Sequence, residues 1–225
     1  MKKYLYGKAE VLLPISKGVY GVRFSDLRHY ALLENERMRD DESYKKFVLH
    51  KDRFSFEING HKIPANSLAD HPSITAYLSP CFCLCFSNKR DDLEMYEWCN
   101  ADVCLEIDLD ALRMVLNTIP LKFKGMRMVE GEVKYYPPIF TGGMPDLNSA
   151  LFYKRDFFSV ESEYRVALIV PPWQKRFRTK EGLGVPIFGK DPLHISVNTD
   201  IPSLTSQYVT EVFFRSGTSV RRAED

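Results

Sequence analysis

The segment at residues 81–87, CFCLCFS, constrains the fold more than any other part of this sequence. Side chains of a strand alternate between its two faces, and here both faces are apolar. Such a run is typical of a strand that lies inside a sheet and is buried on both sides. The same alternation places Cys81, Cys83 and Cys85 together on one face. We therefore predict a central strand at this position.

Strand-like and helix-like patterns mix along the rest of the chain. Strands are predicted within residues 3–15, 18–27, 53–64, 101–108, 126–140, 163–170, 193–199 and 208–217. Helices are predicted within residues 26–50, with a break near residues 39–43, and within residues 88–100, 109–117 and 147–158. Loops are predicted at residues 67–80 and at the basic segment 173–192. Because this order is not a regular βαβ series, we predict one α+β domain over residues 1–225, with mixed, largely antiparallel sheets and short helices.

Several local signals fix the ends of these elements. Asp108 is placed to cap the helix that follows it, and Asp146 or Asn148 and Ser25 or Asp26 are placed to cap two others. The Asn-Gly pair at residues 59–60 lies between two alternating apolar runs. That dipeptide indicates a β-hairpin.

Composition narrows the function classes. The 225 residues are 44% hydrophobic and 27% charged, which suits a buried core, and the net charge is +1. A protein that coats nucleic acid is usually strongly basic, so that class is disfavoured, although a local basic groove stays open. No apolar run approaches the roughly 20 residues of a membrane span, and the N-terminal segment lacks a signal-peptide pattern. We expect a cytoplasmic protein without a membrane partner.

The cysteines and histidines do not suggest a metal site. All five cysteines lie between residues 81 and 104, without the paired two-residue gaps of a structural zinc site. The five histidines are scattered. We expect no metal ion and interpret the cysteines as reduced, buried thiols. The sequence also lacks a glycine-rich phosphate loop and a Gly-x-Ser-x-Gly motif.

The stretch SVESEYRVALIVPP, residues 159–172, carries the strongest chemical signal. Glu161, Glu163 and Arg165 alternate onto one face of a predicted strand, just before its apolar run. A solvated strand end with cross-strand ion pairs is one interpretation. The other is a functional site, with Lys154 and Arg165 offsetting the repulsion between the two carboxylates. Lys154 can also simply pair with Glu161 or Asp156.

Residues 80–108, 131–138 and 151–169 together resemble a bacterial family of unknown function. Its members carry a Cys-Phe-Ser strand, an aromatic helix that runs into a strand ending in an acid, and a Lys-x(6)-Glu-x-Glu-x-Arg block. The same block is similar to ADP-ribosyltransferases, in which a Glu-x-Glu pair begins a strand that continues apolar. In that superfamily an earlier strand ends in a serine motif, here matched by Ser87, and a still earlier strand supplies an arginine, here Arg23. No Ser-Thr-Ser sequence follows Phe86.

The resemblance implies an ADP-ribosyltransferase-like split sheet and NAD as substrate. It implies transfer of ADP-ribose to a macromolecular acceptor, either protein or nucleic acid, or hydrolysis of NAD, in a toxin or phage-defence setting. Glu163 is then the catalytic carboxylate that stabilises the cationic ribose, and Glu161 is the base for the acceptor. Ser87 holds Glu163 or the ribose, and Arg23 pairs with the pyrophosphate.

An aromatic ring is expected to stack on the nicotinamide, and Tyr77, Phe82 and Tyr96 are the candidates. Each assignment has an ordinary alternative: Arg23 as a surface arginine, Ser87 as a turn or helix cap, and Tyr96 with Trp98 as core packing.

Two other functions stay open. One is a nucleic-acid-binding or nucleic-acid-processing protein that uses the acidic pair with the basic segment around Arg176 and Arg178. The other is a non-catalytic interaction module on the same fold.

Overall fold

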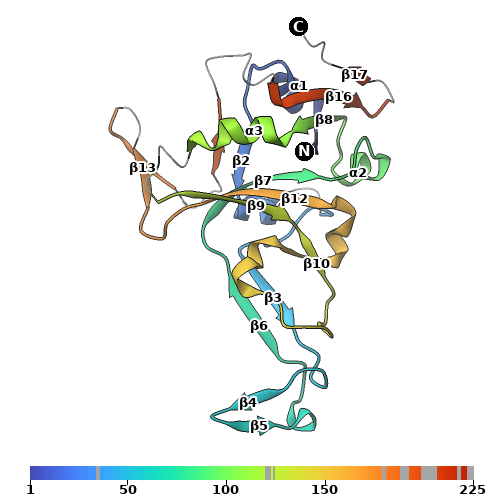
Figure 1. Cartoon of the computed structure of the whole chain (residues 1–225), viewed down its shortest axis with the longest axis vertical. Coiled ribbons are helices and arrows are strands. Elements are labelled where there is room, and N and C mark those ends of the chain that lie inside the picture. The colour runs from blue at the N-terminus through green and yellow to red at the C-terminus, as the bar shows by residue number, and fades with distance from the viewer. Residues whose placement is uncertain are drawn as a thin grey trace.

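A computed structural model describes residues 1–33, 36–119, 123, 125–178, 181–187, 193–198, 207–216 and 219–221. The predicted α+β class is confirmed, because short helices accompany several mostly antiparallel sheets. Figure 1 shows the main sheet in the upper part. Residues 44–77 form an extension, which we call the arm, whose paired strands reach the lower end of the molecule. No helix within the described residues is long and apolar enough to cross a lipid bilayer.

The main sheet is built around the strand that the sequence predicted to be central. Its strands are β1 (Lys2–Gly7), β2 (Arg23–Asp26), β7 (Cys81–Ser87), β8 (Val103–Asp108), β9 (Arg127–Glu132), β12 (Glu163–Ile169), β15 (His194–Ser196), β16 (Val209–Phe214) and β17 (Ser219–Arg221). Along one edge, β7 pairs with the whole of β12, in a register that sets Ser87 opposite Glu163. Its other edge is divided, because β2 pairs with Phe82 and Cys83 whereas β1 meets Ser87 through Tyr4.

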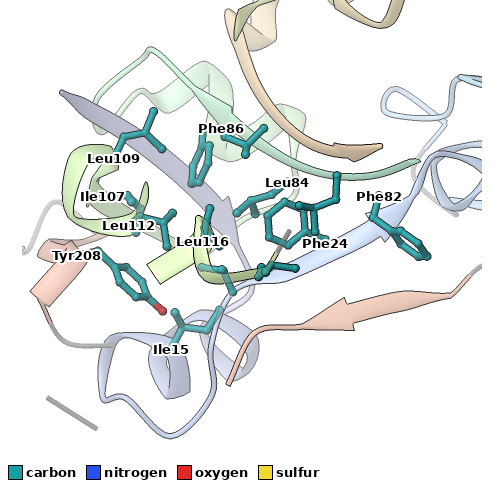
Figure 2. Packing of buried hydrophobic residues seen from close by; sticks show 14 of the residues in the cluster. Ile15, Phe24, Phe82, Leu84, Phe86, Ile107, Leu109, Leu112, Leu116 and Tyr208 are labelled. Carbon is teal, nitrogen blue, oxygen red and sulfur yellow. The ribbon is translucent and has the colours of Figure 1, made fainter. Parts of the chain in front are cut away.

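The core lies on both faces of β7, as the uninterrupted apolar run predicts. On one face, helices α1 (Ala9–Ser16) and α3 (Leu109–Leu116) belong to the largest apolar cluster, and Figure 2 shows Leu109, Leu112 and Leu116 of α3 near Leu84 and Phe86 of β7. A second apolar cluster contains Cys81 and Cys83 with residues from other elements. All five cysteines are free, and burial raises the pKa of Cys83, Cys85, Cys99 and Cys104.

Aspartates cap several of the helices, and the predicted caps at Asp26, Asp108 and Asp146 are confirmed. Asp92 accepts a hydrogen bond from the backbone of Met95 at the start of α2 (Leu93–Trp98), and Asp108 does the same for α3. Asp26 and Asp146 cap two 3₁₀ helices, η1 (Leu27–Leu32) and η3 (Leu147–Phe152). Two further 3₁₀ helices are η2 (Ala65–Ser67) and η4 (Asp156–Glu161). Side-chain acceptors at these positions satisfy backbone N–H groups that the first turn leaves free.

Two predicted elements change type part-way along. The strand predicted at residues 3–15 ends at Gly7, and the following segment is α1, whose buried Leu12 and Ile15 have helical spacing. The helix predicted at residues 147–158 is interrupted by the short strand β11 (Tyr153–Arg155), which pairs with β10 (Lys134–Tyr136).

The arm overturns two predictions. The sequence predicts helix within residues 26–50 with a break near residues 39–43, yet only η1 before the break is helical, and residues 44–48 after it form β3 (Tyr44–Val48). The loop expected at residues 67–80 contains β6 (Ser73–Tyr77), which pairs with β3. In β3, buried Lys45 and Phe47 alternate with exposed Tyr44 and Lys46. Burial thus follows the two-residue period of a strand, but the sequence does not reveal it because one of the buried residues is a lysine.

The far end of the arm is the predicted hairpin. Its strands are β4 (Phe56–Ile58) and β5 (His61–Ile63). Asn59 and Gly60 connect them with φ values of 51° and 82°, the left-handed backbone that a two-residue hairpin turn requires. Figure 1 shows this hairpin as the part of the molecule farthest from α1.

The basic segment is not wholly a loop. Strands β13 (Arg176–Arg178) and β14 (Gly184–Pro186) pair within it. Trp173 is exposed beside this hairpin. Residues 179–180 and 188–192 of the predicted loop lie outside the described residues.

Candidate functional site

Charged side chains meet beneath the start of β12 in an arrangement that we call the ionic cluster. They come from residues 40–45, from β11, and from the junction of η4 and β12. Its members are Asp40, Glu42, Lys45, Lys154, Arg155, Glu161, Glu163 and Arg165. Four carboxylates therefore face four cations, and all but Arg155 are buried.

The backbone at this junction explains why these side chains converge. Ser162 adopts a left-handed φ of 42°, which ends η4 and turns the chain into β12. The amide of Glu163 donates to the Tyr135 hydroxyl at 2.8 Å, and its carbonyl accepts from Val133. The strand start is thus held on a defined path, with Glu163 and Arg165 on one face.

Arg165 is the centre of the cluster. Its side chain is 1% exposed. Nε and Nη2 donate to the two oxygens of Glu163 at 2.8 and 3.1 Å, and Nη2 and Nη1 donate to the two oxygens of Glu42 at 3.1 and 3.2 Å. Nη1 also donates to the Leu151 carbonyl at 2.8 Å. These five contacts match the five N–H groups of a guanidinium, so the donor capacity of Arg165 is used.

Lys154 links the two glutamates of the Glu-x-Glu motif. Its Nζ donates to Glu161 Oε2 at 2.6 Å and to Glu163 Oε2 at 3.2 Å. The same nitrogen lies 4.6 Å from the ring centre of Phe158, a cation–π distance. Burial alone would lower the pKa of Lys154, but attraction to Glu163, Glu161 and Glu42 raises it well above the ordinary value. The amine therefore stays charged.

The pKa values of the three glutamates in the cluster are shifted in different directions. Burial tends to raise the pKa of Glu163 and of Glu42, but the nearby cations outweigh it, with Arg165 the strongest. The pKa of Glu163 is strongly lowered, and that of Glu42 falls to about 2. In Glu161 burial prevails, aided by the charge of Glu163, and its pKa is raised although Lys154 opposes this.

Glu161 lies at the rim of the cluster, beside an aromatic surface. Its Oε1 accepts from Trp98 Nε1 at 3.1 Å. Trp98 is half-buried, and its ring centre is 5.5 Å from that of Phe157, which is 61% exposed. Glu163, by contrast, is 3% exposed with both oxygens bonded to cations. Glu161 is therefore the motif's carboxylate that lies next to a partly open surface.

The four residues of the Lys-x(6)-Glu-x-Glu-x-Arg block are thus brought together as the motif implies. Lys154 pairs with Glu161, one of its two expected partners. The solvated strand end is excluded as an interpretation, because Glu163 and Arg165 are buried.

Ser87 lies opposite Glu163 in the β7–β12 ladder but contacts the backbone. Its hydroxyl donates to the Glu161 carbonyl at 2.7 Å and accepts from the Lys89 amide at 3.1 Å. This is the turn-stabilising role that was the alternative for this serine.

Arg23 and Tyr96 lie outside the ionic cluster. Arg23 is an exposed residue of β2 near His29, whose pKa is lowered by burial and by this arginine. The strand that lies beside Ser87 is β1, so the residue opposite Ser87 is Tyr4 and not Arg23 of β2. Tyr96 is fully buried and donates to Asp91 at 2.8 Å, which fits core packing. Of the other stacking candidates, Tyr77 is exposed on the arm and Phe82 is in the core.

Sequence reasoning missed Asp40, Glu42, Lys45 and Arg155, and it assigned Trp98 to the core. The first three come from a stretch expected to be helical, so no local pattern pointed to β12. Trp98 had one available signal, its place in the aromatic helix of the resemblance. Within the described part of the chain, no group of three or more histidine, cysteine or acidic side chains is arranged to hold a metal ion.

Comparison with known proteins finds no matching protein-family model, no matching curated protein and no matching solved structure. The similarity to ADP-ribosyltransferases therefore rests on the motifs quoted above, and a function has to be argued from the geometry of the cluster.

Proposed function

We propose that this chain binds NAD and breaks its nicotinamide–ribose bond, passing ADP-ribose to a macromolecular acceptor or to water, with Glu161 as the acting carboxylate. The observation that carries the proposal is the position of Glu161, between the buried charges and the Trp98–Phe157 surface. A titratable group in such a setting is a candidate for function.

The chemistry fits this setting. Loss of nicotinamide leaves positive charge on the ribose, and a fixed carboxylate next to that sugar stabilises it. In hydrolysis, water bonds to the ribose carbon, nicotinamide leaves with the electron pair of the broken bond, and the water's proton goes to a base. Burial raises the pKa of Glu161, which brings a carboxylate closer to the range useful for a base near neutral pH. The rings of Trp98 and Phe157 offer flat faces for nicotinamide.

Glu163 and Ser87 are positioning residues in this proposal. Glu163 shares Lys154 with Glu161, and Ser87 holds the Glu161 carbonyl. The earlier assignment of the catalytic role to Glu163 gives way to Glu161 because both oxygens of Glu163 are occupied by Arg165 and Lys154.

The test combines calorimetric titration of NAD into the full chain with measurement of released nicotinamide. Glu161→Gln is expected to keep NAD binding and to lower nicotinamide release by roughly 100-fold or more. Glu97→Gln, an exposed glutamate of α2 next to Trp98, is the matched control and should release nicotinamide like the unaltered chain.

Thermal denaturation of each variant separates loss of activity from loss of folding. Absence of NAD binding by the unaltered chain would refute the proposal. So would a folded Glu161→Gln chain that releases nicotinamide at the unaltered rate.

A non-catalytic interaction module is the second candidate, and the arm favours it. Tyr44 and Tyr77 are exposed partners across the β3–β6 pair, and Ile58 is exposed on the hairpin beyond them. Exposed apolar side chains on an extended element are typical of a contact surface. If NAD does not bind, this becomes the leading candidate. Oligonucleotide binding that weakens steeply with salt and depends on Arg176 and Arg178 would instead favour the nucleic-acid alternative.

A further inference from the structure

An open pocket of about 400 Å³ lies where the arm meets the β10–β11 pair. Its volume is in the range of sites for small molecules, roughly 300–1,000 Å³. The lining of the pocket includes Asp40, Asp41, Tyr44, Lys46, Tyr136 and Arg155. The pocket touches the ionic cluster through Asp40 and Arg155, but Glu161 and Trp98 are not part of its lining.

Three hydrogen-bond donors in this pocket are available to a ligand. Lys46 is exposed and has no acidic partner among the described residues. Arg155 is 57% exposed and uses Nη2 on Asp40 at 3.3 Å, so other N–H groups of its guanidinium stay open. The ring of Tyr136 is buried, yet within the described chain its hydroxyl has no hydrogen-bond partner.

Tyr136 keeps its proton at neutral pH. Burial raises its pKa to about 12, with a contribution from the charge of Asp40 that Arg155 partly offsets. The hydroxyl can therefore donate to an anion. Together with Lys46 and Arg155, it gives the pocket one neutral and two charged donors.

The two acids of the pocket are already engaged. Asp41 accepts from the backbone amide of Ser43 at 3.0 Å and also from the Ser43 hydroxyl. Asp40 faces Arg155 and, at 3.9 Å, the ammonium of Lys45. Lys45 in turn pairs with Glu42. Among the described residues of the lining, neither Lys46 nor Asp41 forms an ion pair, because the donors to Asp41 are the neutral groups of Ser43. Lys46 is thus the cation of the pocket that an anionic ligand can pair with.

A planar ring also has a place to lie. Tyr44 is exposed at the pocket, and its ring centre is 6.3 Å from that of Tyr77 across the strand pair. Aromatic rings of ligands stack on such exposed tyrosines. We propose that this pocket binds a small molecule that carries a phosphate beside a planar ring, such as a nucleoside monophosphate. The site does not depend on the chemistry of Glu161.

Titration calorimetry of the full chain with AMP, adenosine and inorganic phosphate tests the proposal. AMP is expected to bind, with adenosine and phosphate each roughly tenfold weaker or worse, because each lacks one of the two recognised parts. Lys46→Gln and Tyr136→Phe should each weaken AMP binding by roughly tenfold, since each removes one donor. Lys62→Gln changes an exposed lysine of β5 and should bind AMP like the unaltered chain.

Several outcomes would overturn the inference. One is the absence of saturable AMP binding at concentrations up to ~1 mM. Another is AMP binding that Lys46→Gln and Tyr136→Phe both leave unchanged. Inorganic phosphate that binds as tightly as AMP would overturn the proposal that the pocket recognises the planar ring of its ligand. AMP binding without NAD binding would support this pocket while refuting the proposed function, so the two failures are distinguishable.

Discussion

Glu42→Gln removes one buried charge from the ionic cluster while keeping the size of the side chain. Glu42 is 1% exposed and faces three cations: Arg165 through two hydrogen bonds, Lys45 through one, and Lys154 at 3.7 Å. Removing one partner from a buried ion pair costs roughly 3–5 kcal/mol of unfolding free energy, since the remaining charges lose their compensation.

The pKa of Glu42 leads to a similar magnitude. Burial raises this pKa, but Arg165, Lys45 and Lys154 together lower it from 4.5 to about 2. Such a difference corresponds to roughly 3 kcal/mol. Because the folded-state pKa is the lower one, this contribution is fully present above pH 4.5 and is lost as the pH falls toward about 2. The gap in stability between the unaltered chain and Glu42→Gln should therefore narrow across that acidic window.

Urea denaturation followed by circular dichroism, at neutral pH and at several acidic pH values, measures this gap. Glu57→Gln is the matched control, since Glu57 is an exposed residue opposite Lys62 in the hairpin. It should change the unfolding free energy by less than about 0.5 kcal/mol. The reasoning would be refuted if Glu42→Gln were no more damaging than this control, or if its effect did not diminish on acidification.

Three further changes test the packing and the helix ends. Gly21→Ala places a Cβ 1.6 Å from the backbone oxygen of Val197 and should lower the unfolding free energy, measured by urea denaturation, by at least ~2 kcal/mol. Gly142→Ala has open space around the added atom and should leave the unfolding free energy almost unchanged. Equal stability of the two chains would contradict the close contact at Gly21. Leu112→Ala should cost roughly 2–5 kcal/mol, against a small effect of Met114→Ala on the exposed side of α3. Asp92→Ala removes the cap of α2 and should lower the unfolding free energy by roughly 0.5–2 kcal/mol, read from thermal denaturation; an unchanged melting temperature would count against the cap.

The parts of the fold that the sequence predicted are those with local signals. β7 is apolar on both faces, α3 has an aspartate cap and helical spacing, and the β4–β5 turn carries Asn-Gly. Each of these features depends on residues close together in the chain. Their physical causes act within a few residues, so the pattern is visible without the rest of the molecule.

The arm and half of the ionic cluster were not predictable in this way. Burial of Lys45 is compensated by Glu42 and Asp40, and burial of Glu42 is compensated by Arg165, Lys45 and Lys154. A lysine in a charged stretch is normally exposed, so the alternation of β3 could not be recognised. The contact between Glu42 and Arg165 of β12 joins residues that are 123 positions apart in the sequence. No pattern of neighbouring residues indicates it.

The candidate site was predictable as far as the spacing of one motif reaches. Lys154, Glu161, Glu163 and Arg165 lie within twelve residues, and they do meet. Strand alternation alone put Glu163 and Arg165 on one face. It could not show which carboxylate lies at the rim, because that depends on where Trp98 of α2 packs.

Substitution of the two motif glutamates by glutamine leaves different charges of the cluster without a partner. This difference decides whether a loss of activity can be assigned to chemistry or to unfolding. In Glu161→Gln the single amide oxygen can replace only one of the two carboxylate oxygens, which accept from Trp98 and from Lys154. Lys154 still has the charges of Glu163 and Glu42 nearby. In Glu163→Gln the central Arg165 loses one of its two carboxylates within a fully buried site. Loss of activity in Glu163→Gln would therefore carry an unfolding component that denaturation must measure first. The chemical role proposed here is decided at Glu161, because neutralising that carboxylate leaves Lys154 with Glu163 and Glu42 and leaves Arg165 with both of its carboxylates.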